Sequence, residues 1–331
     1  MTAAVLEIDG LSLSVPDPKD GDLTLIRDIS LTIPQGTSVG LVGESGSGKS
    51  LTARAVIGLT PPHARLGGDI RVHGVSLDTL TAAERRKRRG AEMAMVFQNP
   101  RAHINPVRRV GDHLTEGLRL FQGLGGAEAG SRATELLRSV NFDQPETIMR
   151  RYPHQLSGGM LQRVMIAGAL SCEPSLLLAD EPTTALDTTT QAEVMGILKR
   201  LQDERGMAIL FITHDLELAA ASCDRTVVMY GGSIMEEQAS EQLQVHPRHP
   251  YSAALLHARP SLSGDRGRLP TIGGRPVTAA EVTVGCVFAT RCEYAESQCT
   301  RDYVPTRSDH SGRVACLRAD ELTLTGRVVS R

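Results

Sequence analysis

Short apolar runs separated by turn residues characterise the first part of this 331-residue chain. Residues 1 to about 90 alternate such runs with Gly, Pro and Asp, which predicts the strand-rich start of an α/β core. The run Thr37 to Val42 follows the turn Pro34-Gln35-Gly36 and predicts a buried parallel strand. The runs Leu176 to Ala179 and Ala208 to Thr213 predict two further buried strands.

Longer segments in the middle of the chain predict helices. Residues from about 100 to 170 are expected to be mainly helical, and Thr189 to Arg205 predicts one further helix. Gly123 to Gly130 is expected to form a surface turn. For the charged run Glu84 to Arg89 we favour a solvated helix face over the alternative, an anion-binding patch. The core is expected to end near residue 240.

A glycine-rich segment follows the first predicted strand. Gly43-Glu44-Ser45-Gly46-Ser47-Gly48-Lys49-Ser50 fits the phosphate-binding pattern G-x-x-x-x-G-K-[ST]. Its glycines let consecutive backbone N–H groups face phosphate oxygens, and the helix expected to start near Gly48 adds its positive end. Lys49 is expected to reach the β- and γ-phosphates, Ser50 to bind Mg²⁺, and Leu51 to add one more N–H group. The candidate nucleotide-binding residues are therefore Gly43, Ser45, Gly46, Ser47, Gly48, Lys49, Ser50 and Leu51.

Two acidic residues follow the second apolar run directly. Asp180 and Glu181 come after Leu176 to Ala179. A carboxylate at the end of such a strand can hold Mg²⁺, and its neighbour can polarise an attacking water as a general base. Gln98 and His214 also follow apolar runs, although a lone glutamine carries no signal and a lone histidine is more often structural than catalytic. Asp180 and Glu181 are thus the acidic candidates for metal binding and base catalysis.

The pentapeptide Leu156-Ser157-Gly158-Gly159-Met160 stands ahead of the run that ends in Asp180-Glu181. Its serine suits a helix N-cap, and its two glycines permit close approach of the backbone to phosphate. Together with the phosphate-binding segment, this order resembles the ATP-binding-cassette (ABC) ATPases. The resemblance implies an α/β fold, a P-loop NTPase domain of the ABC type at residues 1–245, with an inserted helical subdomain at about 100–170. A small cysteine-containing C-terminal extension would occupy residues 246–331.

The resemblance also assigns roles to single residues. Pro182-Thr183-Thr184-Ala185-Leu186-Asp187 resembles the D-loop of these ATPases, which singles out Asp187. His214 matches the switch histidine that contacts the γ-phosphate, and Gln98 matches the Q-loop glutamine that senses Mg²⁺ and the attacking water. The catalytic candidates are Glu181, His214 and Gln98, and the Mg²⁺ candidates are Ser50, Gln98 and Asp180. The implied cofactors are ATP and Mg²⁺.

The signature residues Ser157, Gly158 and Gly159 would close over ATP held by a partner subunit. Because one chain carries one phosphate loop and one signature, the resemblance implies that two chains meet head to tail. The expected partners are a homologous second ATPase subunit in a heterodimer, two transmembrane permease subunits and an extracytoplasmic substrate-binding protein. The chain itself has no stretch approaching 18 uninterrupted apolar residues. We therefore expect a peripheral subunit on the cytoplasmic face of the inner membrane.

Composition and the N-terminus exclude other classes. A formal net charge of -2, 3% aromatic residues and the absence of Trp argue against nucleic-acid binding. Glu7 and Asp9 lie where a signal peptide would have a basic start and an apolar core.

The C-terminal part narrows the resemblance to a subfamily. His249-Pro250-Tyr251-Ser252, followed by Leu255-Leu256, resembles the segment after the ATPase core in importers of oligopeptides, dipeptides and nickel. Gly285-Cys286-Val287-Phe288-Ala289 with Arg291-Cys292 matches the same group. The implied function is an ATPase subunit that powers import of di- or oligopeptides. The alternatives are a nickel or other solute importer and, from another class, a soluble ABC ATPase of DNA repair or translation.

Four cysteines lie within this C-terminal part with the spacing C-x5-C-x6-C-x16-C: Cys286, Cys292, Cys299 and Cys316. In a cytoplasmic protein they are not expected to form disulfides, which leaves inert thiols, a zinc site or an iron–sulfur cluster. Zinc sites usually use tight Cys-x2–4-Cys pairs, which are absent here. Four thiolates can hold a [4Fe–4S] cluster at looser spacings, and the resemblance implies such a cluster in some members. Cys172 and Cys223 are taken as ordinary packed cysteines.

Overall fold

The computed structural model describes residues 3–17, 21–184, 186–258 and 271–326. The chain divides into two compact units. The first comprises Met1–Glu7, Thr32–Thr37 and Arg71–Leu210, and the second comprises Ile8–Leu31, Ser38–Ile70 and Phe211–Arg331. Within the described residues no helix is long and apolar enough to cross a membrane.

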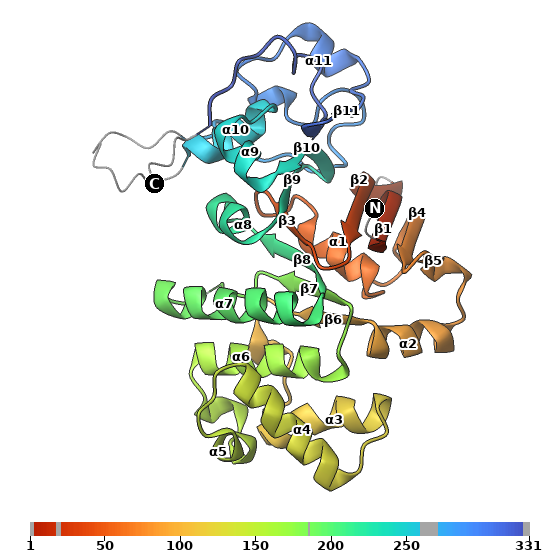
Figure 1. The fold of residues 1–331 in the computed structure, drawn as a ribbon. Helices are drawn as coiled ribbons and strands as arrows, with labels where there is room; N and C mark the ends of the chain where they lie inside the picture. Colours follow the sequence, from red (N-terminus) through yellow and green to blue (C-terminus); the bar gives the residue numbers. More distant parts are fainter. Residues whose placement is uncertain (1–2, 18–20, 185, 259–270, 327–331) are drawn as a thin grey trace. The chain divides into compact units, whose positions relative to one another are not determined.

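The first unit is mainly helical, as the sequence predicted for residues 100–170 (Figure 1). Its strands β6 and β7 pair in parallel, with Met93 opposite Leu176 and Val96 opposite Ala179. Helices α3, α4 and α5 contact one another, and α6 contacts α3 and α4. The elements are β5 (Val75–Ser76), α2 (Ala82–Ala91), β6 (Met93–Val96), α3 (Val110–Phe121), α4 (Gly126–Ser139), α5 (Pro145–Arg150), α6 (Gly158–Ala169), β7 (Leu176–Asp180) and α7 (Thr188–Arg205), with 3₁₀ turns at Leu77–Thr79, Pro100–Ala102, Pro153–Gln155 and Leu170–Cys172.

The second unit contains most of the remaining strands. Its elements are β3 (Ser38–Val42), α1 (Lys49–Val56), α8 (Leu216–Ser222), β9 (Arg225–Tyr230), β10 (Ser233–Ala239), α9 (Ser240–Val245), α10 (Pro250–His257), α11 (Ser297–Arg301), β11 (Arg307–Asp309), β12 (Gly312–Val314) and a 3₁₀ turn at Ala289–Arg291. Four strands contain residues of both units: β1 (Ala4–Asp17), β2 (Gly21–Pro34), β4 (Arg65–Val72) and β8 (Ala208–Thr213).

Two sheets are formed. The smaller has the strand order β2-β1-β4-β5. The larger sheet has the strand order β11-β12-β10-β9-β3-β8-β7-β6. Its strands from β11 to β3 belong to the second unit, and β7 and β6 belong to the first. β3 and β9 pair in parallel, whereas β9, β10, β12 and β11 pair antiparallel in turn. β3, β7 and β8 are buried at every residue, which suits apolar runs in a sheet covered on both faces.

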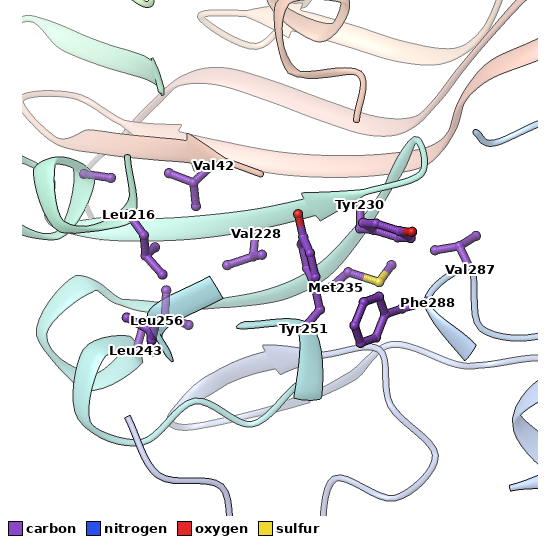
Figure 2. Packing of buried hydrophobic residues seen from close by; sticks show 11 residues of the cluster. Val42, Leu216, Val228, Tyr230, Met235, Leu243, Tyr251, Leu256, Val287 and Phe288 are labelled. Atoms are coloured by element: carbon purple, nitrogen blue, oxygen red, sulfur yellow. The ribbon is translucent and has the colours of Figure 1, made fainter. Parts of the chain in front are cut away.

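The segment after residue 245 belongs to the same compact unit as β3 and α1. Strand β12 pairs with β10, so this segment extends the larger sheet. Buried side chains of the segment, among them Tyr251, Leu256 and Phe288, pack with Val228 and Tyr230 of β9 (Figure 2). The rings of Tyr230 and Tyr251 lie 4.7 Å apart, and those of Tyr230 and Phe288 lie 5.3 Å apart, edge to face. Such aromatic contacts add to the stabilisation from apolar burial.

The three predicted strands are confirmed as β3, β7 and β8, and the helix predicted from Thr189 is confirmed as α7. The run Glu84 to Arg89 lies on α2, where most of its side chains are exposed, so the solvated-face interpretation is confirmed. The surface turn predicted for Gly123 to Gly130 is wrong beyond Gly125, because α4 begins at Gly126. The buried residues of α4 recur at helical spacing: Ala129, Ala133, Leu136 and Leu137. Their burial favours a helix that includes the glycine-rich first turn.

Candidate functional site

The phosphate-loop segment Gly43–Ser50 follows β3 in the second unit. Gly43 has φ +154°, and a Cβ at this position would lie 2.1 Å from the carbonyl oxygen of Met229. No side chain fits there, which explains the glycine physically. Gly46 and Gly48 have φ +82° and +100°, values at which a side chain is strained. The loop therefore curls in a way that needs glycine at these three positions.

Lys49 is buried and its ammonium lies against the loop. Nζ donates to the carbonyl oxygens of Gly43 and Glu44, each at 2.8 Å, and to Ser47 Oγ at 3.2 Å. The helix behind it, α1, has Gly48 as N-cap, no side-chain cap and no acidic residue in its first turn. A helix end without a side-chain cap and without an acidic residue in its first turn favours an anion, because the helix dipole is positive there. One loop and one helix end thus present a positive surface suited to phosphate.

In the first unit, Gln98 and Glu181 are brought together although 83 positions separate them. Gln98 Nε2 donates to Glu181 Oε2 at 2.7 Å, and Thr184 Oγ1 donates to the same oxygen at 2.7 Å. Glu181 has φ +46°, an uncommon conformation for a residue with a side chain. Asp180 ends β7 and is 2% exposed. Thr184 was not among the predicted site residues, although its position three residues after Glu181 was an available signal.

The signature and D-loop residues start two helices of the same unit. Ser157 is the N-cap of α6 and accepts from the Met160 N–H at 3.2 Å, with Gly158 and Gly159 in the first turn. A Cβ at Gly159 would lie 2.4 Å from Cγ2 of Thr190. Asp187 is the N-cap of α7, and hydrogen bonds from Thr190 hold the pKa of its carboxyl below its usual range. Ala185 of the predicted D-loop lies outside the described residues.

His214 directly follows β8, in the second unit. The predicted site residues are therefore divided between the units. The phosphate loop and His214 belong to the second, while Gln98, Asp180 and Glu181 belong to the first, together with the signature and Asp187.

The four C-terminal cysteines line one cavity. The cavity has a volume of about 20 Å³ and is lined by Cys286, Cys292, Cys299 and Cys316 together with His249 and Arg318, among others. None of the four forms a disulfide. Burial raises the pKa of Cys286 to about 12 and also raises the pKa values of Cys292 and Cys316. Among the residues that the structure describes, no group of three or more His, Cys, Asp or Glu could hold a metal ion.

His249, one of the residues that line this cavity, has an unpartnered ring nitrogen. Its Nδ1 accepts from the Tyr251 N–H at 3.0 Å, which assigns the ring proton to Nε2. Burial lowers the pKa of the imidazole to about 3, so the ring is neutral at pH 7. Nε2 is buried and has no hydrogen-bond partner. A buried donor without an acceptor is costly, so this nitrogen is an exception among the buried polar groups of the described residues.

Comparison with known proteins agrees with these features. Residues 26–184 match the family described as ABC transporter, and residues 235–299 match the oligopeptide/dipeptide transporter, C-terminal region. The oligopeptide transport ATP-binding protein OppD of Haemophilus influenzae is 42% identical over 295 residues, which cover 89% of this chain and 91% of that protein. The probable D,D-dipeptide transport ATP-binding protein DdpD of Escherichia coli is 42% identical over 321 residues, covering 96% and 97%.

Solved structures of ABC transporter ATPases are similar to this chain in fold. The bacterial ABC transporter cassette MJ0796, solved as a dimer, has a TM-score of 0.64 and 28% identity, covering 71% of this chain and 98% of that one. The protein cbiO1 of Clostridium perfringens, part of the ABC transporter complex cbiONQ, has a TM-score of 0.63 and 26% identity, covering 73% and 90%. With these relatives, the chain belongs to the ABC transporter ATP-binding proteins, in the group that carries the oligopeptide/dipeptide transporter C-terminal region.

Proposed function

We propose that this chain binds and hydrolyses ATP to power import of di- or oligopeptides through a membrane ABC transporter. The observation that carries the proposal is the phosphate loop, whose glycine conformations and buried Lys49 suit a triphosphate. The proposed cargo is based on the names of two relatives, which are called oligopeptide and D,D-dipeptide transport ATP-binding proteins.

In this proposal the nucleotide is bound by Lys49 and the loop N–H groups, with further N–H groups from the start of α1 through Leu51. Ser50, Gln98 and Asp180 would hold Mg²⁺, which would neutralise charge on the phosphate oxygens of bound ATP. Glu181 acts as general base and orients the attacking water. Its hydrogen bond with Gln98 fixes the carboxylate for that task, and His214 steadies the γ-phosphate.

The proposed active assembly contains two ATPase subunits. Ser157, Gly158 and Gly159 would contact ATP held by the partner, with Asp187 of the D-loop beside them. We propose a heterodimer with a homologous second subunit, two permease subunits and an extracytoplasmic substrate-binding protein, at the cytoplasmic face of the membrane. The nucleotide-binding domain would comprise residues 1–245, with the helical subdomain at about 100–170, and the extension residues 246–331.

We further propose a [4Fe–4S] cluster on Cys286, Cys292, Cys299 and Cys316. The shared cavity and the unpartnered Nε2 of His249 support a bound group. Four thiolates suit a cluster, since each binds one iron. A volume of about 20 Å³ holds roughly one water, so cluster binding requires the cysteine-bearing loops to spread. Iron and acid-labile sulfide should be found in anaerobically purified protein; zinc without sulfide, or no metal, contradicts the cluster.

Uptake of a labelled peptide tests the main proposal. Cells lacking the gene should regain uptake with the wild-type chain and not with Glu181→Gln. If uptake never depends on the gene, the peptide assignment is wrong, and labelled nickel is the next cargo to test. Glu181→Gln serves as the matched control because the cells still contain the full chain, which lacks only the proposed base.

A further inference from the structure

A buried arginine of the C-terminal segment is bonded to the phosphate loop. Arg291 is 4% exposed at its side chain and forms a two-pronged ion pair with Glu44: Nη1 to Oε2 at 2.7 Å and Nη2 to Oε1 at 3.1 Å. Its remaining contacts fix the guanidinium in place, because it also donates to Tyr230 Oη and to the carbonyl oxygens of Ile272 and Gly273. The hydrogen bonds to Glu44 raise the pKa of Arg291 further above its usual range.

A second contact reaches the backbone of the same loop residue. The Glu44 N–H donates to Tyr251 Oη at 2.9 Å. Tyr251 is fully buried beside Tyr230 (Figure 2). The Arg291 guanidinium lies over the ring of Tyr230. Glu44 is therefore held at its side chain by Arg291 and at its backbone by Tyr251. Both holding residues come from the segment after residue 245.

We infer that Arg291 and Tyr251 are positioning residues for ATP binding, which keep the phosphate loop in its binding shape through Glu44. The inference rests on the proposed function of the loop. Glu44 directly follows Gly43, and the carbonyl of each accepts from Lys49. Fixing Glu44 thus fixes the part of the loop against which Lys49 lies. A preorganised loop binds more tightly because less ordering accompanies binding.

Charge gives Arg291 a second effect. Without it, the Glu44 carboxylate would stand unneutralised in a loop that receives a polyanion. Repulsion between that carboxylate and the phosphates would then weaken binding beyond the loss of order. This predicts an unusual pattern of double mutants, because removing Glu44 as well should relieve the repulsion.

The experiment measures ATP affinity and steady-state hydrolysis of the full-length purified chain. Arg291→Met should weaken ATP affinity about tenfold, the equivalent of one lost charge-assisted hydrogen bond, and raise KM with little change in kcat. Glu44→Ala should weaken affinity less, and the double variant should bind ATP more tightly than Arg291→Met alone. Arg291→Lys should bind ATP more tightly than Arg291→Met but less tightly than wild type, because lysine keeps the charge but cannot form the two parallel hydrogen bonds to Glu44.

Arg313→Met is the matched control. Arg313 also belongs to the C-terminal segment and pairs with a buried acid, Glu237, which belongs to β10 and not to the phosphate loop. If Arg291→Met lowers thermal stability as Arg313→Met does and leaves ATP affinity and KM unchanged, the inference is overturned. If Arg291→Met does not fold, Tyr251→Phe and Arg291→Lys decide by the same measurements. A wild-type chain that binds no ATP refutes the proposed function, and with it this inference.

Discussion

Replacing Glu181 with glutamine should separate ATP binding from hydrolysis. Oε2 of Glu181 accepts two hydrogen bonds, from Gln98 and Thr184, each at 2.7 Å. A glutamine carbonyl oxygen can accept both, and glutamine meets the positive φ of this residue no worse than glutamate does. The variant should therefore keep the side chain in place. What it loses is the negative charge that, in the proposed mechanism, polarises the attacking water.

General-base catalysis is worth about 10²–10⁴-fold, which corresponds to about 3–5 kcal/mol of activation free energy. We expect Glu181→Gln to lower kcat by that factor and to leave ATP affinity within about twofold of the wild type. Phosphate release under single turnover, with equilibrium nucleotide binding, measures both quantities. Thr184→Val is the control, because it removes one donor and keeps the carboxylate, and should cause a smaller fall in kcat. Hydrolysis by Glu181→Gln within about threefold of wild type would refute Glu181 as the base.

Three further variants test the loop, the core and the pH response. Gly43→Ala should weaken ATP binding by at least about tenfold, because its Cβ would meet the Met229 carbonyl at 2.1 Å; titration with a fluorescent nucleotide checks it. Leu256→Ala, at a position 3% exposed, should lower the free energy of unfolding in urea by about 2–5 kcal/mol. Burial lowers the pKa of His113, so its contribution to stability is present above the unfolded pKa and lost as pH falls. Between pH 7 and 5, His113→Gln should therefore lose less thermal stability than wild type.

The strands and the phosphate loop could be predicted from sequence because their signals are local. An apolar run of five or six residues indicates β3, β7 and β8 without knowledge of their neighbours. The resemblance assigned roles to Gln98 and Glu181, but the hydrogen bond between them was not predicted, since nothing local connects residues 83 positions apart. The start of α4 was missed because glycines usually indicate turns, whereas burial of Ala129 and Ala133 outweighs that preference.

In the C-terminal segment, too, contacts between residues far apart in the sequence could not be predicted. The cysteine spacing indicated a set of thiols, but not that His249 would also line their cavity. The pair of Glu44 and Arg291 joins residues 247 positions apart. Neither residue stands out locally: Glu44 occupies a variable position of the phosphate-loop pattern, and Arg291 lies beside a more conspicuous cysteine. Only the folded chain makes them partners.

Thermodynamic linkage also predicts the effect of bound ATP on the Arg291–Glu44 pair. If the Arg291–Glu44 pair favours the ATP-binding shape of the loop, bound ATP must favour the pair by the same factor. With the expected tenfold effect on affinity, ATP should slow local opening of the segment around Arg291 by about tenfold. Hydrogen exchange of backbone amides near residues 286–292, measured with and without ATP, reports that opening. The protection should disappear in Arg291→Met even at saturating ATP, and protection that persists there would mean that ATP stabilises the segment by a route other than Glu44.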